Sequence, residues 1–274
     1  MKIITTFAYI LIALIMIYLS YHICYHSIQA DHYQCKMYEE MKFINRVMDF
    51  LNFSDAKKLE LQQLKDSYLV HFNQAKYSSW LFIALSLLIL AGCLINVLQS
   101  LSMDSRLLLV RWIMFISILL LVIGIISPFL RIVMVNEKIR FFPFVLEYRT
   151  KSIATTIQHL STSNFFLCLM IVICSIVIPV FKVLLTYLAT HSKHTGIRNN
   201  SEFILKIIGK WAMTDVFVVA ILLTFLSFDY TKCDLDFGFY YFTAYCILSF
   251  SCIFLIKNQS QNEMAIDDDD WDFD

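Results

Sequence analysis

Residues Phe165–Leu188 read FFLCLMIVICSIVIPVFKVLLTYL, an apolar stretch of 24 residues that contains a single charge, Lys182. A helix needs about 20 predominantly apolar residues to cross the hydrocarbon core of a bilayer, so this stretch predicts a membrane-spanning helix. Similar stretches occur at Ile3–Ile23, Ser79–Leu98, Leu107–Val135, Trp211–Phe228 and Phe239–Ile256. We therefore predict an all-α, multi-pass transmembrane helical bundle with about six spans.

The composition of the whole chain supports a membrane class. Hydrophobic residues make up 59% of the chain and charged residues 16%, against about 45–50% and about 25% in soluble domains. The 24 Phe and 14 Tyr residues exclude a disordered chain. No basic run alternates with exposed aromatic residues, so we predict that the chain does not bind nucleic acid.

Between the first two stretches lies a polar segment, residues 27–78, without Pro or Gly. Its Met and Leu residues recur every three or four positions, which predicts two helices, with a break near Ser54 as a helix N-cap. We predict an extracytoplasmic helical hairpin here. The predicted domains are residues 1–106 (first span, hairpin, second span), residues 107–257 (a four-span module) and residues 258–274 (an acidic cytoplasmic tail).

The distribution of Lys and Arg in the short loops sets the orientation. With both termini in the cytoplasm, eight of these basic residues fall inside and five outside, so we predict cytoplasmic termini. Lys2 precedes the first apolar stretch, which is typical of a signal peptide as well as of a span. We favour a retained span, and a cleaved signal peptide stays the alternative.

Among the charged residues inside predicted spans, Lys182 and Asp215 stand out. A charge near the middle of a bilayer costs about 2.5–3.5 kcal/mol on insertion scales, so such a residue suggests a function. Both lie toward the cytoplasmic side of consecutive spans and could form an ion pair, with Thr214 and Ser175 completing a polar path. The structural alternatives are that Lys182 extends to the interface and that Asp215 lies at a helix N-terminus.

Two of the three prolines, Pro128 and Pro179, also fall inside predicted spans. A proline leaves a backbone carbonyl without its helical donor, which predicts bends around a cavity, or simple packing kinks. Trp211 at the start of a span predicts an interfacial anchor. The sequence has no phosphate-binding glycine motif and no catalytic or metal-ligand constellation, so we predict no enzyme activity, no metal and no cofactor.

Three segments carry a resemblance to a known family. Gly209–Ala220, GKWAMTDVFVVA, resembles the W-x-M-x-D-V-F segment of the paraquat-inducible protein A family. Ile178–Val183, IPVFKV, is similar to the P-x-x-K segment of that family, and Ser127–Phe129 resembles the proline late in the first helix of its module. Order and spacing agree over about residues 107–257, so the resemblance implies one complete four-span module.

The resemblance implies an inner-membrane subunit of a lipid-transport system that passes phospholipid through a polar-lined cavity and works with an MCE-type periplasmic protein. It makes Lys182 and Asp215 candidates for a proton-coupled network. Typical members carry two modules with C-x-x-C zinc ribbons, whereas this chain has one module and no ribbon, so we expect a second copy, by homo-oligomerisation or from another chain. The alternative function is a non-transporting membrane adaptor that docks partners through the hairpin and the acidic tail.

Overall fold

The computed structural model describes residues 2–47, 55–100, 103–136, 144–163, 165–191 and 231–269. The chain divides into two compact units, each assembled from separate segments. Unit 1 comprises Met1–Ser86, Leu119–Thr162 and Ile221–Phe242, and unit 2 comprises Leu87–Ile118, Ser163–Ala220 and Thr243–Asp274.

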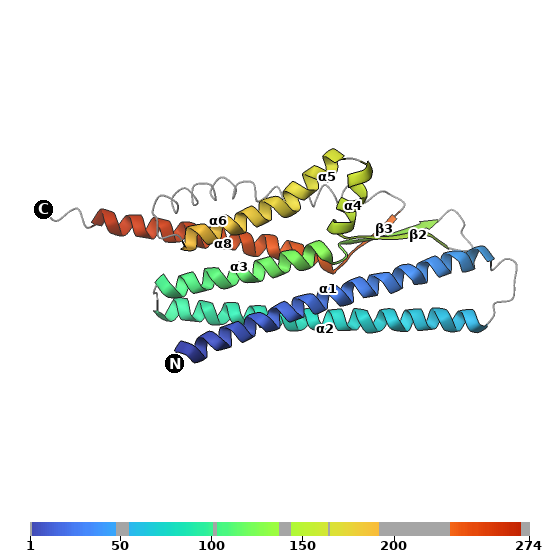
Figure 1. Cartoon of the computed structure of the whole chain (residues 1–274), viewed down its shortest axis with the longest axis horizontal. Helices are drawn as coiled ribbons and strands as arrows, with labels where there is room; N and C mark the ends of the chain where they lie inside the picture. The colour runs from blue at the N-terminus through green and yellow to red at the C-terminus, as the bar shows by residue number, and fades with distance from the viewer. Residues whose placement is uncertain are drawn as a thin grey trace. The chain divides into compact units, whose positions relative to one another are not determined.

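Two long helices, α1 (Lys2–Val47) and α2 (Asp55–Ser100), begin the chain. In unit 1 they run side by side in opposite directions (Figure 1). Each has 46 residues, which corresponds to about 69 Å at 1.5 Å per residue. The hydrocarbon core is about 30 Å thick, so a large part of each helix extends beyond it. The predicted spans and hairpin helices are therefore continuous, and the predicted cap Ser54 lies outside the described residues.

Exposed aromatic rings mark one edge of the bilayer on these two helices. Tyr21 and Tyr25 of α1 and Tyr77 and Trp80 of α2 are all exposed. A hydrogen bond between His22 and Ser78 places the two pairs at the same level. Tyr and Trp are enriched at membrane–water interfaces, so we assign these four residues, called the aromatic belt below, to the interface.

Helix α3 comprises Met103–Ile126 and ends nine residues before Val135, the predicted end of this span. The chain instead turns at Pro128 and enters strand β1 (Leu130–Asn136). Proline lacks an N–H and disfavours helical geometry in the residue before it, so it ends a helix here. The expectation that Pro128 bends a spanning helix is therefore wrong.

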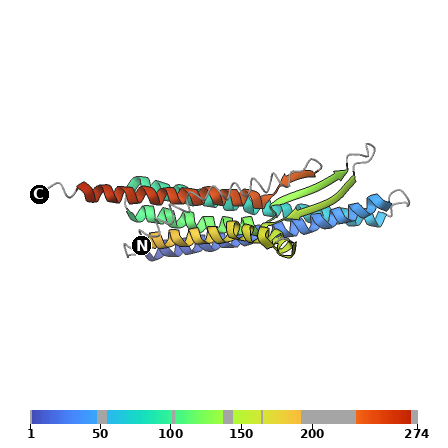
Figure 2. The ribbon, with the colours of Figure 1, turned by 90° about the horizontal axis from the view of Figure 1, so that it is seen from above.

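The described strands form one antiparallel sheet in unit 1, in the order β2-β1-β3. Strand β2 is Phe144–Lys151 and β3 is Thr231–Leu235. Leu130 of the central strand lies opposite Lys151 on one side and Leu235 on the other. Helix α1 packs against β2, and the sheet lies along the part of α1 that leads away from the N-terminus (Figure 2). The sequence predicts the end of a spanning helix at β1 and loop segments at β2 and β3, so the sheet is an addition to the predicted bundle.

The remaining helices follow the predicted spans more closely. After α4 (Ile153–Ser163), three consecutive segments form one apolar helical stretch: α5 (Phe165–Val172), the π-helix η1 (Ile173–Val177) and α6 (Ile178–His191). Helix α8 is Phe237–Asp269 and begins with the predicted sixth span.

Four of the described helices are long and apolar enough to cross a membrane, and a shorter apolar segment begins α8. They are Phe7–Glu40, Leu59–Gln99, Leu107–Ile126 and Cys168–Leu188, with the shorter segment at Phe237–Cys252. These helices confirm the predicted multi-pass helical fold. The predicted span Trp211–Phe228 lies outside the described residues, and the domain boundaries stay predictions.

Candidate functional site

The first candidate site is one face of the η1–α6 segment in unit 2, which we call the Lys182 face. Its members, Ser175, Pro179, Lys182 and Thr186, follow one another at spacings of four, three and four residues. Residues at these spacings share one side of a helix. All four are buried, and Lys182 is only 4% exposed, so the face points into the protein.

The opposite side of the same segment is apolar and exposed. Its exposed side chains are Val177, Val180, Phe181, Leu184 and Tyr187. In a spanning helix, charged side chains almost always face the protein interior while apolar side chains face lipid. Lys182 therefore does not extend to the lipid-facing surface, and the burial of Ser175 on the same face agrees with the predicted polar path.

The backbone beside Lys182 departs from α-helical geometry. The N–H of Ile178 donates to the carbonyl of Ile173, five residues back, within η1. Pro179 follows directly and has no N–H to donate to the carbonyl of Ser175. π-Helical turns are frequent at functional sites, and this one contains Ser175 of the Lys182 face.

Lys182 interacts with a second helix of unit 2. Its ammonium group is close enough to Cys252 of α8 for a coulombic interaction, and the Cys252 thiol is buried and free. Of the other predicted site residues, Trp211, Thr214 and Asp215 lie outside the described residues. The ion pair between Lys182 and Asp215 therefore stays a prediction.

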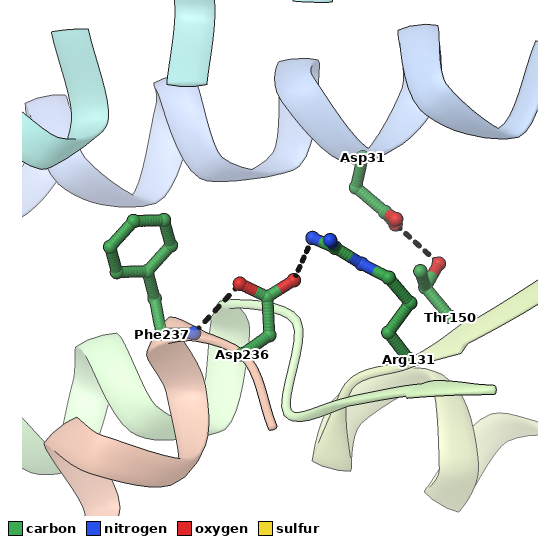
Figure 3. Close-up of polar contacts among 5 residues, drawn as sticks. All are labelled: Asp31, Arg131, Thr150, Asp236 and Phe237. Atoms are coloured by element: carbon green, nitrogen blue, oxygen red, sulfur yellow. Dashed lines mark hydrogen bonds and ion pairs between the residues drawn. The ribbon is translucent and has the colours of Figure 1, made fainter. Parts of the chain in front are cut away.

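A second polar cluster, the Arg131 cluster, lies in unit 1 (Figure 3). Arg131 of β1 forms an ion pair with Asp236 at 2.6 Å. The other carboxylate oxygen of Asp236 accepts a 2.9 Å hydrogen bond from the N–H of Phe237 and so caps α8. Thr150 of β2, which lies opposite Arg131, donates to Asp31 of α1 at 2.7 Å.

The Arg131 cluster connects three parts of unit 1: helix α1, the sheet and the start of α8. Asp31 is six residues beyond Tyr25 of the aromatic belt, which is about 9 Å along the helix. The cluster therefore lies on the protruding side of the assigned aromatic belt. One carboxylate oxygen of Asp31, Oδ1, is buried without a hydrogen-bond partner among the described residues.

Sequence reasoning missed the Arg131 cluster. Arg131 and Asp236 are 105 positions apart, and Asp31 and Thr150 are 119 positions apart, so no local pattern links them. A signal was present in Arg131 itself, because an arginine three residues after Pro128 argues against a continuing span.

The comparison with known families decides the identity. The sequence model of the family described as paraquat-inducible protein A matches residues 112–259, which is more than half of the chain. The chain belongs to the paraquat-inducible protein A family. The match contains the Lys182 face together with Arg131, Thr150 and Asp236. No curated protein and no solved structure matched the chain.

The family match begins after the first two helices. Residues 1–111, which include Asp31 and all of α1 and α2, lie outside the matched segment. In this paraquat-inducible protein A family member, Asp31 of the Arg131 cluster is therefore supplied by a segment that the family model does not describe. The hydrogen bond from Thr150 to Asp31 connects that segment to the family module within unit 1.

Proposed function

We propose that this membrane protein of the paraquat-inducible protein A family is a subunit of a lipid-transport system. In this proposal, phospholipid passes through a cavity lined by polar groups of the helical bundle, and an MCE-type protein receives or delivers it. The observation that carries the proposal is the buried ammonium group of Lys182 on a helix whose other side is apolar and exposed.

The physical argument starts from the cost of this ammonium group. A lysine at the centre of a spanning helix costs about 2.5–3.5 kcal/mol on insertion scales, which is an upper value for Lys182 because it lies nearer to one end of its span. A helix that needed only to pack would avoid that cost with an apolar residue. A buried cation offers an electrostatic partner for a phosphate headgroup or for the Asp215 carboxylate of another predicted span. Exchange between these two partners would couple lipid passage to a change in the bundle.

The proposed place of the protein is the inner membrane, with both termini in the cytoplasm. The ends of α1 and α2 near Val47 and Asp55 then extend beyond the bilayer on the extracytoplasmic side, since each helix is about 69 Å long. An MCE-type periplasmic partner would meet the protein on this side. A single module also suits assembly with a second copy of the chain.

The test replaces the chromosomal gene with single variants and measures the lipid composition of the cell envelope. Lys182→Met and Asp215→Asn should reach the membrane in normal amounts but lose lipid transport. Phe181→Leu, which changes an exposed neighbour on the lipid side, is the matched control and should transport normally. Normal lipid composition in both Lys182→Met and Asp215→Asn would overturn the proposal.

The protruding helices also support a second candidate, a non-transporting adaptor. More than half of the length of α1 exceeds the hydrocarbon thickness, which gives a surface for a partner protein. Removing residues 41–65 would shorten both protruding ends and leave the aromatic belt in place. An adaptor should then lose its partner and all function, whereas a transporter should keep residual lipid transport.

A further inference from the structure

Three histidines and a serine form an unbroken hydrogen-bond chain between α1 and α2 in unit 1. His22 Nδ1 lies 2.8 Å from Ser78 Oγ, and His22 Nε2 lies 3.1 Å from His26 Nε2. His26 Nδ1 lies 2.8 Å from His71 Nδ1. His26 is the central member, is 9% exposed, and uses both ring nitrogens. We call these four residues the histidine chain.

The neighbouring rings hold the imidazoles in place. Tyr33 stacks on His71 with an interplanar angle of 10°, and Tyr25 meets His26 edge-on. The titratable groups that act on His26 are His22 on its own helix and His71 on α2. The chain is therefore a fixed row of imidazoles with no carboxylate in contact with its central member among the described residues.

The geometry does not fit a metal site. The two nitrogens of His26 face different partners, so the three rings do not converge on one point. Over the described ranges, no group of three His, Cys, Asp or Glu side chains is arranged to hold a metal ion. The contacts instead require protons, because each nitrogen–nitrogen contact needs one donor and one acceptor.

Three neutral imidazoles can form all hydrogen bonds of the histidine chain in two arrangements of their protons. In the first, Ser78 donates to His22, His22 to His26, and His26 to His71, which keeps its own proton on Nε2. In the second, every hydrogen bond is reversed, and His22 donates to Ser78. Both arrangements leave all three rings neutral and every contact made.

A proton that enters at one end converts the first arrangement into the second. Ser78 passes its proton to His22 Nδ1 and takes up the incoming one. His22 then releases the Nε2 proton to His26, and His26 releases the Nδ1 proton to His71 Nδ1. His71 finally loses the Nε2 proton to water. One N–H bond breaks for each that forms at every ring, so one proton enters and one leaves.

The position of the histidine chain gives this transfer a direction in space. His71 lies six residues from Tyr77 toward the protruding end of α2, whereas Ser78 lies between Tyr77 and Trp80 of the aromatic belt. Farther along the same helices, Ser20 and Ser86 are buried, and the Ser86 hydroxyl donates to the carbonyl of Phe82. We propose that the histidine chain is a proton relay between the protruding ends of α1 and α2 and the membrane-spanning part of unit 1. The relay lies outside the residues matched by the family model, so its test is independent of the transport proposal.

The test is nuclear magnetic resonance of the full chain in lipid nanodiscs with ¹⁵N-labelled histidine. The relay predicts a coupling across the hydrogen bond between His22 and His26, and shifts of both His26 nitrogens averaged between protonated and bare forms. The hydrogen-bonded ring nitrogens of His22 and His71 should show the same averaging, because both rings exchange their proton position in the two arrangements.

A second measurement uses His26→Gln, whose amide can hold both hydrogen bonds but cannot relay a proton. The averaging at the ring nitrogens of His22 and His71 should be lost, and His32→Gln, which changes an exposed histidine of α1, is the matched control that should leave it unchanged. Fixed protonation of each His26 nitrogen in the wild type, or averaging at His22 and His71 that survives His26→Gln, would overturn the proposal. Because the wild-type spectrum decides the first point, the test does not depend on how well the variant folds.

Discussion

Removal of the ion pair between Arg131 and Asp236 should lower the free energy of unfolding of unit 1, and the length and burial of the pair allow an estimate of how much. The pair is 2.6 Å long, and its side chains are 18% and 10% exposed. Removing one partner of a buried pair costs about 3–5 kcal/mol, and the remaining exposure favours the lower end. We therefore expect Arg131→Met to lower the free energy of unfolding by about 3 kcal/mol.

Replacements of Asp236 should show a graded effect, because its carboxylate has two partners. Asp236→Asn keeps an oxygen that accepts from the N–H of Phe237 but leaves the Arg131 charge without its partner, which should cost about 3 kcal/mol. Asp236→Ala also loses the helix cap, which adds about 1 kcal/mol. The measurement is chemical unfolding of the purified protein in detergent, followed by circular dichroism.

The double variant Arg131→Met/Asp236→Asn separates the ion pair from other effects of each substitution. Its destabilisation should fall short of the sum of the two single effects by at least about 1 kcal/mol. Phe181→Leu in unit 2 serves as a control that leaves the cluster untouched. Additive effects of Arg131→Met and Asp236→Asn would refute the reasoning, because they would show that the two side chains do not stabilise each other.

Three further predictions follow from individual contacts. Gly238→Ala should lower the free energy of unfolding by about 1–3 kcal/mol, because a Cβ atom there would lie 2.6 Å from the Ser127 carbonyl oxygen. Gly92→Ala, where no atom lies within 4 Å of the added Cβ, should not destabilise the protein. Equal unfolding midpoints for the two variants would contradict this prediction. Thr150→Val should cost about 1–3 kcal/mol by leaving the Asp31 carboxylate without its donor, and no change in unfolding would count against the contact. Pro179→Ala restores a backbone donor, so the protein should become more stable while lipid transport falls; undiminished transport would show that η1 has no functional role.

The sequence predicts the spanning helices well and the sheet poorly, for one physical reason. Long apolar runs such as Phe165–Leu188 can only be buried or face lipid, so length and composition suffice to assign them. The run from Leu107 to Val135 is also apolar, but it contains the end of α3 and most of β1. Periodicity cannot separate a buried strand from a helix in such a run, and the strand partners are distant in the sequence.

The candidate site divides in the same way. The shared face of Ser175 and Lys182 follows from their helical spacing, so their burial could be expected from the sequence. The contact between Arg131 and Asp236 depends on the pairing of β1 with β3, which no local signal specifies. The histidine chain likewise requires the register of α1 against α2, which places His26 beside His71, 45 positions away.

The most direct test of the transport account is gentle purification of the protein from native membranes, with mass spectrometry of the proteins and lipids that come with it. The account predicts an MCE-type partner and bound phospholipid in the wild type, and a preparation of Lys182→Met that keeps the partner but has lost most of the phospholipid. A different membrane protein as the main partner, with no enriched lipid in the wild type, would contradict it.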